Sequence, residues 1–174
     1  MVADSVTILT DADRLRLRQR YEEEGYCISP PLIHPTTLDR ARAAVAAVMA
    51  GEYETDVSPI YRNWNPGDAP RSLVKIDLPH LCNRDIQQLV TDPKIGAWAA
   101  GVLGAKFVQL WACELIYKFP EAQLEPQRYG VIGWHQDDHF WAHWAGDVFT
   151  LWLALLDSYA CPVLFGLPSA VGVV

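Results

Sequence analysis

His135 and Asp137 are the two side chains of this sequence whose types and spacing best suit a metal ion. In an extended segment, side chains at positions i and i+2 leave the same face of the strand, so an imidazole and a carboxylate can converge on one cation. Two histidines and one carboxylate on one side of an iron ion leave positions open for a co-substrate and dioxygen, as in non-haem Fe(II) oxygenases. The spacing therefore predicts two of the three protein ligands of such a site.

Two other interpretations of this region stay open. The pair could be a hydrogen-bonded histidine and carboxylate on a surface strand. His139 and His143 follow His135 at i+4 and i+8, so on a helix these three residues would form a face suited to zinc. The glycine and the aromatic residues between 133 and 144 do not favour a regular helix.

The composition limits the number of domains and the class of partner that we expect. A chain of 174 residues, 51% hydrophobic and 20% charged, predicts a single globular domain over 1–174 with an aromatic core. The net charge of -7 disfavours a nucleic-acid partner and favours a small-molecule substrate.

The cysteines and the apolar segments indicate the compartment. Cys27, Cys82, Cys113 and Cys161 are widely spaced and form no C-x-x-C pair, so we expect reduced thiols in a cytoplasmic protein. The apolar stretch 161–174 is about 14 residues long and contains Pro and Gly, whereas a spanning helix needs about 20 apolar residues. We therefore expect no membrane role.

Helices are predicted in the first part of the chain. A charged surface helix over 10–24 ends at Gly25, and a short strand begins at 26–28. A second helix opens at Thr36 and carries an apolar stripe until Gly51. Residues 52–71 read as a long loop of the kind that often forms lids or binding segments. Two short helices follow within 85–103, the second over 94–103 and ending at Gly104.

Strands are predicted in the second part. Residues 107–117 are aromatic and β-branched and end before Pro120, which favours a strand. A second strand is predicted over 148–156 and a shorter one over 131–137. Helices followed by strands predict an α+β fold, with helices packed on an antiparallel sheet.

Several motifs in this order carry a resemblance to a known family. They are Glu24-Gly25-Tyr26, the helix segment 38–42, Leu115-Ile116-Tyr117-Lys118-Phe119-Pro120, Trp134-His135-Gln136-Asp137 and Leu151-Trp152-Leu153-Ala154-Leu155. With them the chain, from roughly Leu15 to Leu156, resembles the phytanoyl-CoA dioxygenase family of Fe(II)- and 2-oxoglutarate-dependent oxygenases. The tetrad at 134–137 is the specific part of this resemblance.

The resemblance implies a fold and a set of roles. The fold would be a partial double-stranded β-helix, or jelly roll, with a helical part over about 10–104 packed on a β part over about 106–166. His135 and Asp137 would bind iron. Four residues would line or contact the 2-oxoglutarate co-substrate: Gln136, Trp152, Lys75 and Glu114. The reaction would use dioxygen to hydroxylate a small aliphatic or acyl substrate.

The chain departs from the family pattern after residue 156. The family continues into a Pro-Gly-Ser-His segment that bears the distal iron-ligating His, and then into an Arg that binds the far carboxylate of 2-oxoglutarate. Here the last histidine is His143 and the last basic residue is Arg128. We therefore expect an incomplete catalytic domain, truncated at its C-terminus, with impaired activity. A non-catalytic jelly-roll binding module and a zinc-binding protein or hydrolase remain as alternatives.

Overall fold

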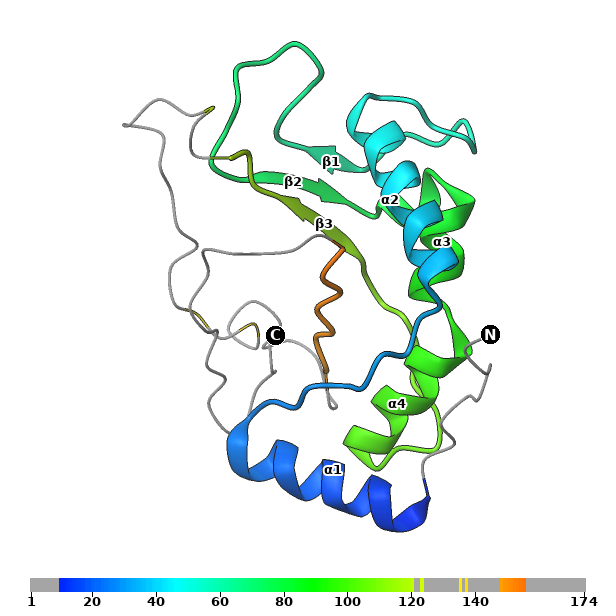
Figure 1. Ribbon diagram of the computed structural model, residues 1–174. Coiled ribbons are helices and arrows are strands. Elements are labelled where there is room, and N and C mark those ends of the chain that lie inside the picture. The colour runs from blue at the N-terminus through cyan, green and yellow to red at the C-terminus, as the bar shows by residue number, and fades with distance from the viewer. Residues whose placement is uncertain (1–9, 121–122, 124–134, 136, 138–147, 156–174) are drawn as a thin grey trace. The chain divides into compact units, whose positions relative to one another are not determined.

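A computed structural model describes residues 10–120, 123, 135, 137 and 148–155 (Figure 1). The described residues form two compact units, each assembled from separate stretches of the chain. The first unit contains the described residues up to Leu32, the segment Pro93–Gln109, and the described residues from 135 onwards. The second unit contains Ile33–Asp92 and the described residues from Leu110 to 123.

Helix α1, Asp11–Glu24, belongs to the first unit and is fixed by its ends. The Thr10 side chain accepts from the Asp13 N–H, and the Asp13 carboxylate accepts from the Thr10 N–H, which is a capping box. Gly25 ends the helix in the left-handed conformation, with φ 77°. No residue of α1 is fully buried, so the predicted surface helix over 10–24 is confirmed.

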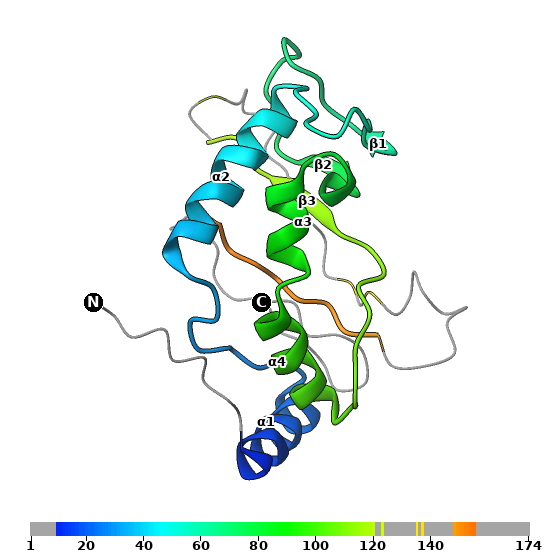
Figure 2. The same ribbon diagram turned by 90° about the vertical axis from the view of Figure 1, so that its right-hand side faces the viewer.

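Helix α4, Pro93–Leu103, lies beside α1 in the first unit (Figure 1, Figure 2). It buries Trp98 and Val102 among other apolar residues, and it ends before Gly104, whose φ is 65°. The helix predicted over 94–103 is therefore confirmed. A side chain at Gly104 would meet the Arg18 guanidinium of α1.

The segment 148–155 completes the described part of the first unit. The ring of Phe149 lies 5.6 Å from that of Tyr21 in α1 and 6.0 Å from that of Trp98 in α4, measured between centroids. No strand is assigned within 148–155, so the strand predicted over 148–156 is wrong there. A strand needs a hydrogen-bonded partner backbone, and no described residue pairs with this segment.

The second unit is a small antiparallel sheet with helices on it. In chain order it contains α2 Pro35–Met49, β1 Tyr61–Arg62, β2 Val74–Asp77, the 3-10 helix η1 Pro79–Leu81, α3 Arg84–Val90 and β3 Glu114–Tyr117. The strand order is β1-β2-β3, with Arg62 opposite Ile76 and Asp77 opposite Glu114. Helices together with an antiparallel sheet agree with the predicted α+β class. The first of the two short helices predicted within 85–103 is α3, and it is also confirmed.

The core of the second unit lies between one face of the sheet and two helices. Val74 and Ile76 of β2 are fully buried against Val48 of α2 and Ile86 of α3. Because side chains alternate along a strand, Lys75 and Asp77 lie on the opposite face. The sheet therefore has one apolar face and one charged face.

Both ends of α2 are held by side chains from outside it. The His34 ring accepts from the Thr36 N–H, so the helix begins one residue before the predicted Thr36. At the other end the Arg62 guanidinium donates to the carbonyl oxygens of Met49, at 3.0 Å, and Val48, at 3.4 Å. Arg62 thus joins β1 to the C-terminus of α2.

Two further strand predictions are wrong or too long. No strand is assigned at 26–28, and of the strand predicted over 107–117 only Glu114–Tyr117 pairs with the sheet. The stretch 107–117 passes from the first unit to the second, and Phe107 at its start is 82% exposed. One hydrogen bond extends the pairing, from the Leu78 N–H to the Cys113 carbonyl oxygen.

Among the described residues no helix is long and apolar enough to cross a membrane.

Candidate functional site

His135 and Asp137 face each other in the first unit. His135 Nε2 lies 3.2 Å from Asp137 Oδ1. The Asp137 side chain is 15% exposed and the His135 side chain 38% exposed, so the carboxylate is the more enclosed of the two. The structure thus brings together the two residues that the i, i+2 spacing predicted to converge.

Thr150 supplies a partner for the other carboxylate oxygen. Its hydroxyl Oγ1 donates to Asp137 Oδ2 at 2.8 Å, an ordinary distance for a hydrogen bond to a carboxylate. The two oxygens of Asp137 therefore have different partners. Sequence reasoning missed Thr150, and the only available signal was a hydroxyl residue two positions before Trp152.

Aromatic packing holds the segment that carries Thr150. Phe149, its neighbour in the chain, lies edge-on to Tyr21 and at a tilt to Trp98. Such aromatic pairs add about 0.5 to 1.5 kcal/mol each beyond the burial of their surfaces. Helices α1 and α4 thereby position the hydroxyl that binds Asp137.

The pair has a geometry that a divalent cation could use. First-row divalent metals bind imidazole nitrogen and carboxylate oxygen at about 2.0 to 2.2 Å, so two such donors at a right angle lie about 3.0 Å apart. The observed 3.2 Å between Nε2 and Oδ1 is close to this separation. The donor types, one imidazole and one carboxylate, also suit Fe(II). His135 and Asp137 thus fit two neighbouring coordination positions.

Further ligands do not come from the described residues. Among these, no group of three or more His, Cys, Asp or Glu side chains could hold a metal ion. Gln136, His139 and His143 lie outside the described residues.

Lys75 and Glu114 form a charged group on the charged face of the second unit's sheet. Lys75 Nζ lies 2.9 Å from Glu114 Oε1 and 3.5 Å from Asp77 Oδ1. Burial acts to lower the pKa of Lys75, but the Glu114 and Asp77 carboxylates outweigh it and raise the pKa above its usual value. Lys75 is therefore a stable cation between two carboxylates, and the three groups together carry one negative charge.

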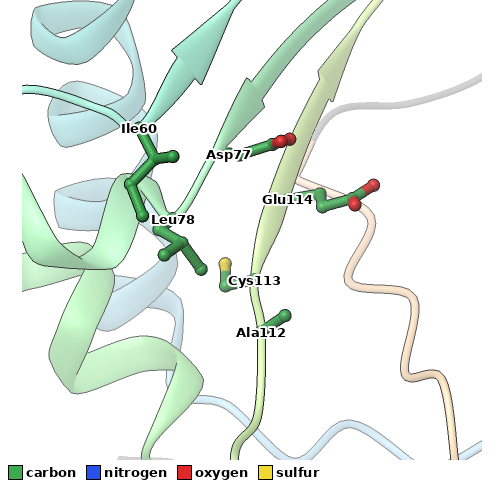
Figure 3. A pocket seen from close by; sticks show the side chains of 6 residues that line it. All are labelled: Ile60, Asp77, Leu78, Ala112, Cys113 and Glu114. Atoms are coloured by element: carbon green, nitrogen blue, oxygen red, sulfur yellow. The ribbon is translucent and has the colours of Figure 1, made fainter. Parts of the chain in front are cut away.

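A small open pocket borders this charged group. It has a volume of about 150 Å³ and is lined by Ile60, Asp77, Leu78, Ala112, Cys113 and Glu114 (Figure 3). Figure 3 shows the carboxylates of Asp77 and Glu114 on one side and the side chains of Ile60 and Leu78 on the other. Its volume is below the roughly 300 to 1,000 Å³ of pockets that hold small ligands.

Cys113 in this pocket is an unreactive thiol at neutral pH. Burial, with a further contribution from the Glu114 carboxylate, raises the pKa of Cys113 to about 11. Since the thiolate is the nucleophile, this position does not suit nucleophilic catalysis.

The predicted co-substrate residues thus fall into both units. Trp152 belongs to the first unit, and its side chain is exposed rather than part of a core. Lys75 and Glu114 belong to the second unit and contact each other. Asp77, which sequence reasoning did not single out, completes their charged group.

A family model described as Phytanoyl-CoA dioxygenase (PhyH) matches residues 21–160, which is most of the chain. The matched range includes His135, Asp137 and Thr150 as well as Lys75 and Glu114. No curated protein and no solved structure matches the chain.

Proposed function

The chain belongs to the phytanoyl-CoA dioxygenase family, and on this premise we propose that it acts as an Fe(II)- and 2-oxoglutarate-dependent dioxygenase that hydroxylates a small aliphatic or acyl substrate. The observation that carries the proposal is the 3.2 Å approach of His135 Nε2 to Asp137 Oδ1. Bound there, Fe(II) would allow dioxygen to convert 2-oxoglutarate and a C–H substrate into succinate, CO2 and the hydroxylated product.

A fold is proposed together with this function. We expect a single domain over 1–174 that forms a partial double-stranded β-helix, with the N-terminal helices packed on the sheet. The antiparallel order β1-β2-β3 and the packing of α2 and α3 on one of its faces support this proposal.

The proposed roles are those that the resemblance to the family implies for these positions. His135 and Asp137 hold the metal, and Gln136 and Trp152 line the co-substrate. Lys75 attracts a carboxylate of 2-oxoglutarate, and Glu114 lies beside it. Because Lys75 is already paired with Glu114 and Asp77, the co-substrate has to compete with these two carboxylates for the ammonium group.

Metal affinity is expected to be low for a site held by His135 and Asp137 alone, and the 174 residues contain no histidine after His143 that could add a ligand. Loss of residues that only support metal ligands already weakens such sites by about 10- to 100-fold. Turnover through such a two-ligand site should be impaired for the same reason.

The experiment is an anaerobic titration of the protein with Fe(II) and 2-oxoglutarate, followed by visible absorption. A charge-transfer band should appear in the wild-type chain and be lost in Asp137→Asn. The matched control is Asp39→Asn, which makes the same charge change at an exposed position on α2. Oxygen is then admitted and succinate measured. A wild-type chain with neither band nor succinate would overturn the proposal.

A further inference from the structure

We infer that Thr150 is a positioning residue of the candidate iron site, whose hydroxyl holds one oxygen of Asp137 so that the other is presented to the cation. The inference rests on the proposed function, because it takes His135 and Asp137 as the metal ligands. It adds a residue that acts through Asp137 rather than on the metal.

The two carboxylate oxygens are distinguished by their contacts. Thr150 Oγ1 donates to Oδ2 at 2.8 Å, while Oδ1 lies 3.2 Å from His135 Nε2. The last torsion of an aspartate side chain has a broad energy profile, so a carboxylate without such a bond can rotate. A hydrogen bond to Oδ2 restricts this rotation and keeps Oδ1 on the side of His135.

The enclosure of Asp137 makes this bond matter more. Its side chain is only 15% exposed, so water has little access to replace a lost donor. A hydrogen bond to a charged group in such surroundings is stronger than one between neutral groups. Removing the hydroxyl should therefore change the orientation of the Asp137 carboxylate, because a water molecule does not readily replace the lost hydrogen bond.

Thr150 is itself restrained. Threonine is branched at Cβ and has few side-chain rotamers, which limits the directions of its hydroxyl. The adjacent Phe149 is packed on Tyr21 and Trp98, so the backbone that carries Thr150 is tied to α1 and α4. The donor is thus held in place before a metal binds.

The test compares metal binding in variants that remove or keep the hydroxyl. Co(II) replaces Fe(II), because its visible d–d bands report ligand geometry and it needs no reductant. Thr150→Val keeps the shape and branching but removes the donor, and Thr150→Ser keeps the donor. We expect Co(II) affinity to fall about 10-fold in Thr150→Val, with altered d–d bands, and Thr150→Ser to stay close to wild type.

Two controls separate the donor from packing. Phe149→Leu loosens the segment that carries Thr150 but keeps the hydroxyl. Its Co(II) affinity should therefore fall less than that of Thr150→Val. Thr150→Ala removes the hydroxyl by a different change and replaces Thr150→Val if circular dichroism shows that the latter is unfolded. Equal losses in Thr150→Ser and Thr150→Val would assign the effect to packing and overturn the inference.

The remaining outcomes distinguish this inference from the proposed function. If the wild type binds Co(II), Asp137→Asn does not, and Thr150→Val matches the wild type in affinity and spectrum, the positioning role is wrong and the iron site stands. If the wild type and Asp137→Asn both fail to bind Co(II), the iron site itself is wrong, and the role of Thr150 is wrong with it.

Discussion

Lys75 is held by two carboxylates, and in the role proposed for it a co-substrate would have to displace one of them. Its ammonium group lies 2.9 Å from Glu114 and 3.5 Å from Asp77. All three side chains are partly exposed, so each pair is weakened by solvent and contributes little to stability, about 0 to 1 kcal/mol. An incoming dianion can therefore displace a carboxylate from Lys75 at small cost.

We predict opposite effects from changes on the two sides of this ion pair. Lys75→Ala should weaken 2-oxoglutarate binding about 10-fold, because a charge-assisted hydrogen bond is lost. Glu114→Gln should strengthen it about 2- to 5-fold, since a competing negative charge is removed while the size is kept. The measurement is isothermal titration with 2-oxoglutarate in the presence of Co(II). Lys75→Arg keeps the charge and is the control, and unchanged binding in Lys75→Ala would refute the role of this lysine.

At the scale of elements, Arg62 is the link between β1 and α2. Besides the two carbonyl oxygens at the end of α2, its guanidinium donates to Tyr53 Oη and to the Trp64 carbonyl oxygen, both at 2.7 Å. The last carbonyls of a helix lack partners within it, and a cation there is favourable. One side chain thus satisfies groups from three separate stretches of the second unit.

Arg62→Ala is therefore expected to lower the free energy of unfolding by about 2 to 3 kcal/mol, because partly buried acceptors lose charged donors. Arg62→Lys keeps the charge near the end of α2 but cannot reproduce the planar fork, so it should recover only part of the loss. Urea unfolding followed by circular dichroism gives both values. Equal stability of wild type and Arg62→Ala would show that water replaces these bonds without loss.

Gly104 tests the junction of α1 and α4. Its φ of 65° is unfavourable for other residues, and an added Cβ would meet the Arg18 side chain. We predict that Gly104→Ala lowers the free energy of unfolding by about 1 to 2 kcal/mol. Gly67→Ala is a matched control, because Gly67 also has a positive φ, 92°, but nothing lies within 4 Å of its Cβ position. In thermal unfolding Gly104→Ala should lower the midpoint temperature more than Gly67→Ala does. An equal decrease in the two variants would mean that the Arg18 side chain simply moves aside.

The elements that could be predicted are those with local signals. Thr10 and Gly25 delimit α1, and Gly104 follows α4, because caps and left-handed glycines depend on a few neighbouring residues. The strands depend on distant partners. β2 pairs with β3 across a long stretch of sequence, and although its four residues alternate apolar and charged as a strand does, they do not reveal the partner.

The same distinction applies to the candidate site. The i, i+2 spacing singled out His135 and Asp137, and in the structure Nε2 of His135 lies 3.2 Å from Oδ1 of Asp137, although Asp137 lies in a turn and neither residue is in a strand. Thr150 lies 13 positions after Asp137, beyond any local motif, and its contact depends on how the first unit folds around Phe149. Asp77 could not be singled out for a similar reason, since its position opposite Glu114 is set by the register of β2 and β3.

At the scale of the whole molecule, stability is expected to decline in alkaline solution. The pKa of Cys113 is raised by burial from an ordinary value of 9.0 to about 11, and burial does the same for Cys27. Between these pH values the unfolded chain loses the thiol protons and the folded chain keeps them. Stability is therefore complete below about pH 9 and is lost as the pH rises towards 11.

The expected loss from Cys113 is on the order of 1 to 2 kcal/mol, because one pKa unit corresponds to about 1.4 kcal/mol. The raised pKa of Lys75 acts in the same direction. The check is urea unfolding at pH 8 and pH 10.5 in the presence of a reductant, with Cys113→Ala as the control. This variant should show a smaller decline, and an identical decline would mean that Cys113 titrates alike in both states.

The first unit draws on stretches far apart in the chain, and this has a consequence for synthesis on the ribosome. Helix α1 emerges early, but Phe149, which packs on its Tyr21, is translated much later. Helix α1 exposes little apolar surface before that, because it has its own caps and none of its residues is fully buried in the folded unit. Helix α4 differs, because Trp98 and Val102 are buried in the folded unit and are exposed to water until the rest of the unit has been made. A chaperone that recognises apolar segments should therefore bind nascent α4 in preference to nascent α1.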